Sequence, residues 1–471
     1  MTEGANGGIL SIKSRKDKKR MKRKIGFSTT RLIMLSFLAA IFVGSLLLWL
    51  PISSADEVSV SYIDALFTAT TATCVTGLVT LPTVSTWSVF GQIIILLLIQ
   101  IGGLGIITVM AGITAALHKK MGLSDRLLIQ DAFNLNSLSG LSEFIKKVII
   151  GTFAVEGVGA LCYMTVFVPK FGFRGIWISV FNSVSAFCNA GIDIISENSL
   201  CEYTLNPVIN LVTSLLIILG GLGYIVWWDI ARVLTSKNIK KRKAFRHLTL
   251  HSKIVLSSTA LFIIVGGVLI FAFEYNNPLT IGNMNLFEKL EVSLFQSITT
   301  RTAGFASVPQ QNLTNGSALT SMLLMFIGGS PVGTAGGVKT VTAVVLIASA
   351  ISAIKNKNEV SLFGRTIPKA AVSKAIGVVG MSFATVFVST LLMTAVTDTS
   401  FLDILYETVS ATATVGLSRN LTGSINELGK LIIIITMYLG RVGPISLAVA
   451  FTLKKQSVNL IKEPTENISV G

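Results

Sequence analysis

Four short, half-apolar segments recur along the chain, and each ends in a loop that contains a glycine. Aligned on these glycines, Gly77, Gly191, Gly304 and Gly416 follow one another at intervals of 114, 113 and 112 residues. A nearly constant period of this kind is the signature of internal structural repeats. Each copy reads long apolar segment, short segment, glycine-containing loop, long apolar segment. The sequence therefore predicts four copies of one helical unit.

Eight long apolar segments flank the short ones, at about residues 32–50, 90–117, 143–168, 207–235, 252–273, 317–352, 374–396 and 429–453. About 20 apolar residues cross a bilayer, so the short segments, with roughly 10–12 residues before the loop, fit re-entrant helices. The chain is 13% charged and 51% hydrophobic, whereas soluble domains carry about 25% charged residues. We expect an all-α polytopic membrane protein in which four span–pore helix–span repeats surround a pseudo-fourfold pore, with eight transmembrane and four re-entrant helices.

Charge placement predicts the orientation and the domain limits. The basic residues behind the net charge of +16 cluster in the N-terminal tail and in the linkers between repeats, which is the positive-inside pattern of cytoplasmic segments. This placement favours contact with anionic membrane lipid and excludes a nucleic-acid partner. We expect a cytoplasmic tail at 1–30, repeat 1 at 31–117, a linker at 118–142, repeat 2 at 143–235, a basic linker at 236–251, repeat 3 at 252–352, a linker at 353–373, repeat 4 at 374–453 and a cytoplasmic tail at 454–471.

The four loops have the backbone chemistry of a cation filter. Each short helix would direct its partially negative C-terminus toward the membrane centre, and rings of backbone carbonyls replace the hydration shell of an alkali cation. Glycine permits the positive φ that turns carbonyls inward. The predicted ion selectivity filter comprises Thr73, Cys74, Val75, Thr76 and Gly77; Phe187, Cys188, Asn189, Ala190 and Gly191; Thr300, Arg301, Thr302, Ala303 and Gly304; and Thr412, Ala413, Thr414, Val415 and Gly416.

The apolar run over 317–352 is too long for one span and is interrupted by FIGGSPVGTAGGVKT, residues 326–340. Glycine and proline at this density do not hold a regular helix. Unwound backbone at membrane depth is tolerated only inside protein or beside a water-filled path. We expect a broken helix beside a polar pathway; a glycine-rich packing face between helices is the alternative. Val338 stands where a phosphate-binding loop needs glycine before Lys339, which argues against nucleotide binding.

The remaining polar residues predict no catalytic or metal centre. Four cysteines (Cys74, Cys162, Cys188 and Cys201) and three histidines show neither metal-ligand spacing nor a nucleophile–base pair. We therefore expect a non-enzyme without a cofactor in this chain. Glu156 lies in an apolar span and is expected to pair with a neighbouring helix.

Several motifs resemble the Trk/Ktr/HKT superfamily of potassium transporters, in particular its membrane subunit of the KtrB type. They are YIDALFTATTATCVTGL followed by LIQIGGLGIIT, SAFCNAG followed by GGLGYIVWWD, TTRTAGF followed by MFIGGSPVGTAGGVKT, and SATATVGL followed by YLGRVGP. The resemblance covers about residues 30–455. The basic N-terminal tail is longer than this family leads us to expect.

The resemblance implies potassium uptake across the cell membrane through a channel-like pore. In that family glycine in the first filter loop goes with K⁺ selectivity, and this chain has Gly77. It also implies Na⁺ as activator, a homodimer, and a cytosolic ring of nucleotide-binding regulatory subunits. No G-x-G-x-x-G fingerprint follows a strand here, so the regulator would be a separate polypeptide. A secondary transporter that couples K⁺ to Na⁺ or H⁺ is the alternative, although such transporters usually show inverted repeats.

The family's intramembrane gate corresponds to the broken helix. The resemblance implies a gate formed by Gly328, Gly329, Ser330, Gly333, Thr334, Gly336, Gly337 and Lys339; Arg441, which lies in the last span, is a further candidate gate residue. A charge at that depth normally faces a bundle interior, so we expect Arg441 to hold the gate through carbonyls or to repel a cation; a structural tie between helices is the alternative. Arg301 is expected behind the filter, paired with an acid such as Glu407 or Asp64, or else exposed at the rim.

Overall fold

The computed structural model describes residues 29–443, apart from 56–58, 106–107, 110–140, 237–239, 241–242 and 358. The expected C-terminal tail lies outside the described residues, as do the N-terminal tail except residues 29–30 and the linker 118–142 except its last two residues. Most residues after 105 in the apolar segment 90–117, and all residues after 443 in the segment 429–453, also lie outside the described residues.

Each repeat opens with a long helix. These helices are α2 (Thr29–Leu48), α8 (Leu141–Phe171), α13 (Leu250–Glu274) and α17 (Lys369–Val396). They contain 20 to 31 residues, and at 1.5 Å per residue even the shortest covers the roughly 30 Å of a bilayer core. All four have the length and the apolar composition of membrane spans.

A short helix follows each long one. These are α3 (Tyr62–Cys74), α9 (Phe173–Cys188), α14 (Leu286–Thr299) and α18 (Phe401–Ala413), with 13 to 16 residues. Ser61, Asn285 and Ser400 cap three of them by accepting a hydrogen bond from a first-turn backbone N–H. Asn285 and Glu288 form a reciprocal capping box. At this length the helices are too short to cross the bilayer.

The closing helix of each repeat is shorter than its apolar segment. These helices are α5 (Val89–Leu104), α10 (Pro207–Leu222), α15 (Asn315–Phe326) and α19 (Glu427–Val442). The residues after α5, α10 and α19 are Gly105, Gly223 and Gly443, with φ of 82°, 86° and 89°, a conformation that ends an α-helix. The segment 207–235, predicted as one span, is two helices, because α11 (Tyr224–Thr235) leaves α10 at 95°.

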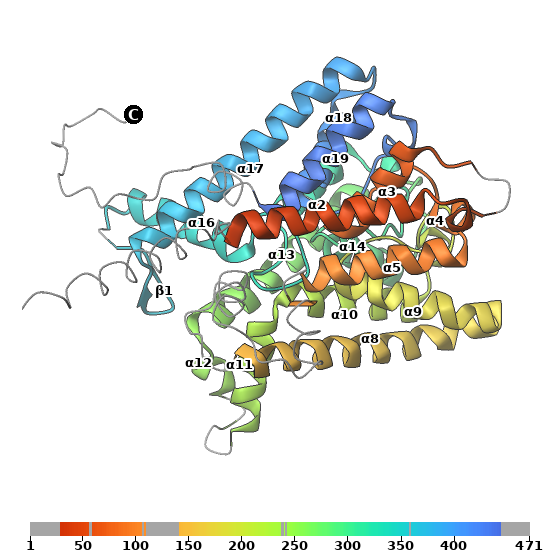
Figure 1. Cartoon of the computed structure of the whole chain (residues 1–471). Coiled ribbons are helices and arrows are strands. Elements are labelled where there is room, and N and C mark those ends of the chain that lie inside the picture. The colour runs from red at the N-terminus through yellow and green to blue at the C-terminus, as the bar shows by residue number, and fades with distance from the viewer. Residues whose placement is uncertain are drawn as a thin grey trace, which may run out of the picture.

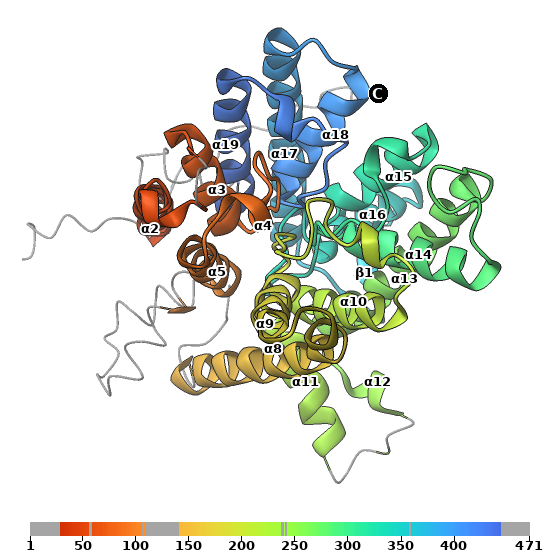
Figure 2. The same cartoon turned by 90° about the vertical axis from the view of Figure 1, so that its right-hand side faces the viewer.

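The four repeats are arranged around a common axis, which Figure 1 shows from the side and Figure 2 end-on. Figure 2 shows them in chain order around the centre, from α2, α3 and α5 through α8–α10 and α13–α15 to α17–α19. Each closing helix packs on the short helix of the next repeat: α5 on α9, α10 on α14, α15 on α18, and α19 back on α3. Lys430 of α19 also pairs with Asp64 of α3 at 2.6 Å. The last repeat is therefore joined to the first.

The remaining elements of the described residues are short, except α16 with 15 residues. They are α4 (Thr83–Thr86), α12 (Ala244–His247), α16 (Thr340–Ile354), the 3-10 helices η1 (Pro51–Ser53), η2 (Cys201–Tyr203), η4 (Gln310–Asn312) and η5 (Thr422–Ser424), and strands β1 (Ser361–Leu362) and β2 (Arg365–Thr366). The two strands pair antiparallel as a hairpin. Arg419, in the loop after α18, pairs with Asp403 at 2.6 Å and donates to the carbonyl of Gln310 at 3.0 Å. Repeats 3 and 4 are thereby also joined through their loops.

Candidate functional site

The site is built from four glycine loops, residues 73–77, 187–191, 300–304 and 412–416, which we number first to fourth. The residue two before each glycine adopts a left-handed conformation: Val75, Asn189, Thr302 and Thr414 have φ between 51° and 63°. Positive φ is uncommon outside glycine. The glycines themselves have φ of 96°, 63°, 81° and 99°. All four loops thus reverse direction after the short helix with the same local geometry.

The four glycines meet in a closed ring. A Cβ built on Gly77 would lie 2.5 Å from the carbonyl oxygen of Ala190, and one on Gly191 would lie 2.6 Å from that of Ala303. A Cβ on Gly304 would contact the carbonyl of Val415, and one on Gly416 that of Thr76. Each contact is closer than real Cβ atoms come. The loops therefore approach one another through backbone alone, in the order first, second, third, fourth, first.

Buried hydroxyl groups brace each loop. Thr71 Oγ1 accepts a hydrogen bond from the backbone N–H of Gly77 at 2.9 Å, and Ser410 Oγ accepts one from Gly416 at 3.0 Å. In the other two repeats the hydroxyl donates to a carbonyl past the glycine, Ser185 to Ile192 at 2.5 Å and Thr299 to Phe305 at 2.7 Å. These four residues were not among those predicted from the sequence. They are recognisable there as a Ser or Thr five or six residues before each glycine.

A second set of glycines lets the closing helices touch the loops. A Cβ on Gly102, Gly220 or Gly440 would overlap the carbonyl oxygen of Thr73, Phe187 or Thr412, respectively. These glycines begin a recurring pattern: Gly102-Gly103-Leu104-Gly105, Gly220-Gly221-Leu222-Gly223 and Gly440-Arg441-Val442-Gly443. Arg441 therefore stands where two other repeats have a second glycine, directly after the glycine that contacts the fourth loop.

The interrupted segment, residues 327–339, joins α15 to α16 and forms an ordered loop. Ile327 and Val338 make an isolated parallel bridge at its base. Ser330 N–H donates to Gly221 O at 2.9 Å, and Thr334 N–H donates to Gly220 O at 3.1 Å. Its unwound backbone is thus bound to the end of α10, as expected for backbone that is buried in protein.

The interrupted segment also contacts the glycine loops. Thr334 Oγ1 donates to Phe187 O at 3.0 Å, and Gly336 N–H donates to Thr302 Oγ1 at 3.0 Å. Thr334, Gly336 and Ser330 are buried, whereas Gly333, Gly337 and Lys339 are half-buried. The ammonium of Lys339 donates to Ala335 O at 2.6 Å. The structure therefore brings the predicted gate residues and predicted filter residues into direct contact.

Arg441 reaches the interrupted segment from α19. Its Nη1 donates to Thr334 O at 2.8 Å and its Nη2 to Gly102 O at 2.5 Å. The carbonyl contact that we expected of this side chain is present. Arg441 also links the fourth repeat to two others, because Gly102 O belongs to the first repeat and Thr334 O to the third.

The predicted partner of Arg301 is wrong. Its guanidinium donates to Thr259 O at 3.3 Å and to Gly328 O at 3.2 Å, while Asp64 pairs with Lys430 and Glu407 accepts from Thr422. Arg301 is 7% exposed, so the rim-exposed alternative is wrong as well. The side chain leaves the third loop toward α13 and the interrupted segment of its own repeat, where its hydrogen-bond partners among the described residues are carbonyl oxygens and not acids.

Glu156 of α8 has a partner on a neighbouring helix, as expected. Gln100 Nε2 of α5 donates to Glu156 Oε1 at 3.1 Å. Cys188, at the end of α9, also contacts this carboxyl group. All four cysteines are free thiols. Among the residues that the structure describes, no group of His, Cys, Asp and Glu has the arrangement of a metal site.

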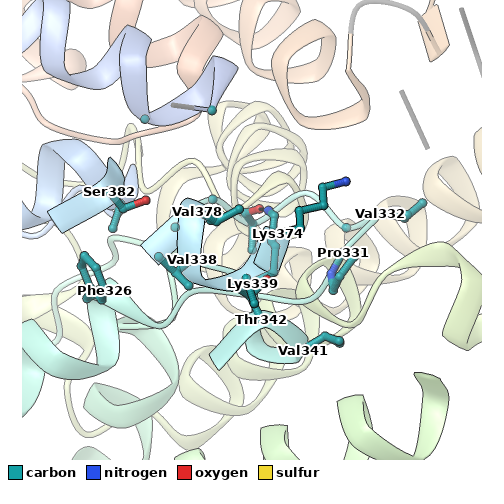
Figure 3. Close-up of a pocket in the computed structure, with 18 of the residues that line it drawn as sticks. Phe326, Pro331, Val332, Val338, Lys339, Val341, Thr342, Lys374, Val378 and Ser382 are labelled. Carbon is teal, nitrogen blue, oxygen red and sulfur yellow. Dashed lines mark hydrogen bonds between the residues drawn. The ribbon is translucent and has the colours of Figure 1, made fainter. Parts of the chain in front are cut away.

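A cavity of about 840 Å³ lies against the interrupted segment, α16, α17 and the end of α19. In Figure 3, Phe326 and Val338 lie alongside Val378 and Ser382 of α17, with Lys339 among them. Arg441 and Lys374 also line it, and its described lining contains no carboxylate. The described lining is therefore largely apolar, carries the basic side chains of Lys339, Lys374 and Arg441, and includes Thr412 and Ala413 of the fourth loop.

The chain is similar to known cation transport proteins over almost its whole length. The sequence model of the family described as TrkH, cation transport protein, matches residues 5–462. The chain is 37% identical over 434 residues to Ktr system potassium uptake protein B of Bacillus subtilis, covering 92% of this chain and 95% of that protein. It is 39% identical over 460 residues to potassium/sodium uptake protein NtpJ of Enterococcus hirae, covering 96% and 99%.

A solved structure supports the fold. The crystal structure of the potassium transporter TrkH from Vibrio parahaemolyticus superposes with a TM-score of 0.74, at 16% identity, over 92% of this chain and 86% of that chain. This match confirms the predicted all-α polytopic membrane fold. The family model and the two relatives confirm the resemblance that the motifs indicated. The chain is a multi-pass membrane protein that belongs to the TrkH family of cation transport proteins.

Proposed function

We propose that this chain takes up K⁺ across the cell membrane through the ring of four glycine loops, passively and in the manner of a channel. The observation that carries the proposal is the closed ring in which each loop glycine contacts a backbone carbonyl of the next loop. Backbone carbonyls in a ring replace the hydration shell of K⁺ without any charged side chain. The printed names of both relatives, a potassium and a potassium/sodium uptake protein, support a monovalent cation as cargo.

In this proposal the interrupted segment is the gate. It lies across one side of the ring, bonded to the second and third loops. The positive charge of Arg441 and Lys339 in the adjoining cavity opposes a cation there. Arg441 keeps the segment in place through Thr334 O. Opening then requires the contact between Arg441 and Thr334 O to break, while the bonds of the segment to the second and third loops stay in place.

The proposal includes assembly and regulation. The name of the B. subtilis relative, a Ktr system protein, supports a membrane subunit that works with other components. We assign a homodimer in the plasma membrane with both termini cytoplasmic, a cytosolic ring of nucleotide-binding subunits that moves the gate, and Na⁺ as activator. The basic linkers between repeats support the cytoplasmic side for the regulator.

Uptake of radioactive Rb⁺ into proteoliposomes that hold the purified chain tests the function. Rb⁺ uptake that unlabelled K⁺ inhibits far better than Na⁺ is the expected result, and external Na⁺ at low concentration should increase the rate. Empty vesicles and vesicles with heat-denatured protein are the controls. Uptake that Na⁺ inhibits as well as K⁺ does would contradict a potassium pathway.

A second candidate is a transporter that couples K⁺ to Na⁺ or H⁺, and the name of the E. hirae relative, a potassium/sodium uptake protein, favours it. The reversal potential separates the two candidates. For a passive pore it follows the K⁺ gradient alone, whereas for a coupled transporter it shifts when the Na⁺ or H⁺ gradient is changed at constant K⁺.

Thr71→Val is expected to reduce the preference for K⁺ over Na⁺ roughly fivefold, because it removes a buried hydrogen bond to the loop that is worth about 1 kcal/mol. Thr70→Val is the matched control, since the Thr70 hydroxyl donates to Leu66 of its own helix at 2.7 Å. The measurement is inhibition of Rb⁺ uptake by each cation. Equal preferences in the two variants would show that the brace at Thr71 has no effect on the loop.

A further inference from the structure

Thr334 lies where the interrupted segment and the second glycine loop meet. Its hydroxyl donates to Phe187 O at 3.0 Å and lies 3.2 Å from Asn189 Oδ1. Its backbone N–H is held by Gly220, and its carbonyl accepts from Arg441. Thr334 is fully buried. A hydrogen bond in such a site is stronger than one in water, so the position of the interrupted segment is transmitted directly to the loop backbone.

A second contact of the same kind lies one repeat further on. Gly336 N–H donates to Thr302 Oγ1 of the third loop, and Arg301 of that loop donates back to Gly328 O. A Cβ on Gly336 would overlap Thr414 Oγ1 of the fourth loop, so the segment contacts that loop closely as well. The equivalent residue in the first loop is Val75, which has no polar side-chain atom to bond. The contacts are therefore asymmetric around the ring.

We propose, on the basis of the proposed function, that Thr334 helps to determine the preference for K⁺ over Na⁺ and is also part of the gate. With the interrupted segment in place, the Thr334 hydroxyl fixes the carbonyl of Phe187 and the side chain of Asn189. The second loop then keeps the spacing that fits K⁺. These bonds are kept when Arg441 releases Thr334 O, so the second loop keeps this spacing while cations pass. Thr302 holds the third loop in the same way, by accepting the hydrogen bond from Gly336 N–H.

The test compares Thr334→Val with Thr334→Ser in proteoliposomes. Valine preserves the shape and removes the hydroxyl, whereas serine keeps it. Thr334→Val should lower the K⁺ over Na⁺ preference roughly fivefold, which corresponds to about 1 kcal/mol for one hydrogen bond, and Thr334→Ser should restore it. Thr320→Val is the matched control: that hydroxyl donates to Gly316 of the same helix at 2.8 Å, away from the loops. A purely structural role would change the amount of active protein and not the preference.

Thr302→Val provides an independent variant if Thr334→Val does not fold. Val75 occupies the equivalent position in the first loop with φ of 56°, close to the 63° of Thr302, so valine fits this backbone. It should lower the preference in the same direction. Unchanged preference in both valine variants, while Gly77→Ser changes it, would overturn the inference and leave the proposed function standing. If Gly77→Ser also leaves the preference unchanged, the glycine ring is not the filter and the proposed function fails.

Discussion

Gly77→Ser is expected to lower the preference for K⁺ over Na⁺ at least tenfold. Gly77 has a φ of 96°, and a Cβ there would lie 2.5 Å from Ala190 O of the second loop. Serine therefore forces the first loop away from its neighbour and changes the spacing of the carbonyls. A tenfold change corresponds to about 1.4 kcal/mol of discrimination. Competition of Na⁺ and K⁺ against Rb⁺ uptake in proteoliposomes measures it.

Gly157→Ser is the matched control for this change. Gly157 lies in α8, and a Cβ built there has no neighbour within 4 Å. The same substitution at an open helix position should leave the cation preference as it is in the original chain. A Gly77→Ser variant that keeps full K⁺ preference would show that the ring does not select the cation.

Arg441→Ala is expected to raise Rb⁺ uptake about tenfold in vesicles that contain no regulatory subunit. The change removes donors to Thr334 O and Gly102 O, and hydrogen bonds to a charged group are worth about 1.5–3 kcal/mol each. It also removes a positive charge from the cavity beside the interrupted segment. Both effects favour the conducting position of the segment. The initial uptake rate per reconstituted protein is the quantity to compare.

Arg419→Ala separates gating from general loss of stability. Arg419 also donates to carbonyls of repeat 3, at Gln310 and Leu313, but it lies in the loop after α18. Its loss should lower the unfolding temperature without raising uptake. If Arg441→Ala leaves uptake unchanged, Arg441 is a structural tie and the gating role is wrong.

The repeat architecture was predictable because each unit repeats the same local chemistry. Short apolar segments that end in a glycine loop cannot span a bilayer, and four such units at one period leave few arrangements. The break after Phe326 was also predictable, since several glycines and Pro331 interrupt one apolar run. These features depend on local backbone preferences, which a single sequence displays directly.

Contacts between distant segments were harder to predict. The third loop contains Arg301, but its backbone conformation decides whether the side chain points to the acids of α3 and α18 or to Thr259 and Gly328. The ends of α5, α10 and α19 depend on glycines inside apolar runs, and glycine alone does not say whether a helix continues or stops. The braces at Thr71 and Ser410 were visible only as small polar residues in apolar helices.

Anomalous diffraction from crystals of the full chain grown in Rb⁺ would show whether the glycine ring binds the cation. We expect Rb⁺ peaks on the axis of the ring formed by Gly77, Gly191, Gly304 and Gly416, which Na⁺ does not displace at equal concentration and K⁺ does. Rb⁺ bound elsewhere in the membrane region of a transport-competent protein, with no peak in the ring, would contradict it.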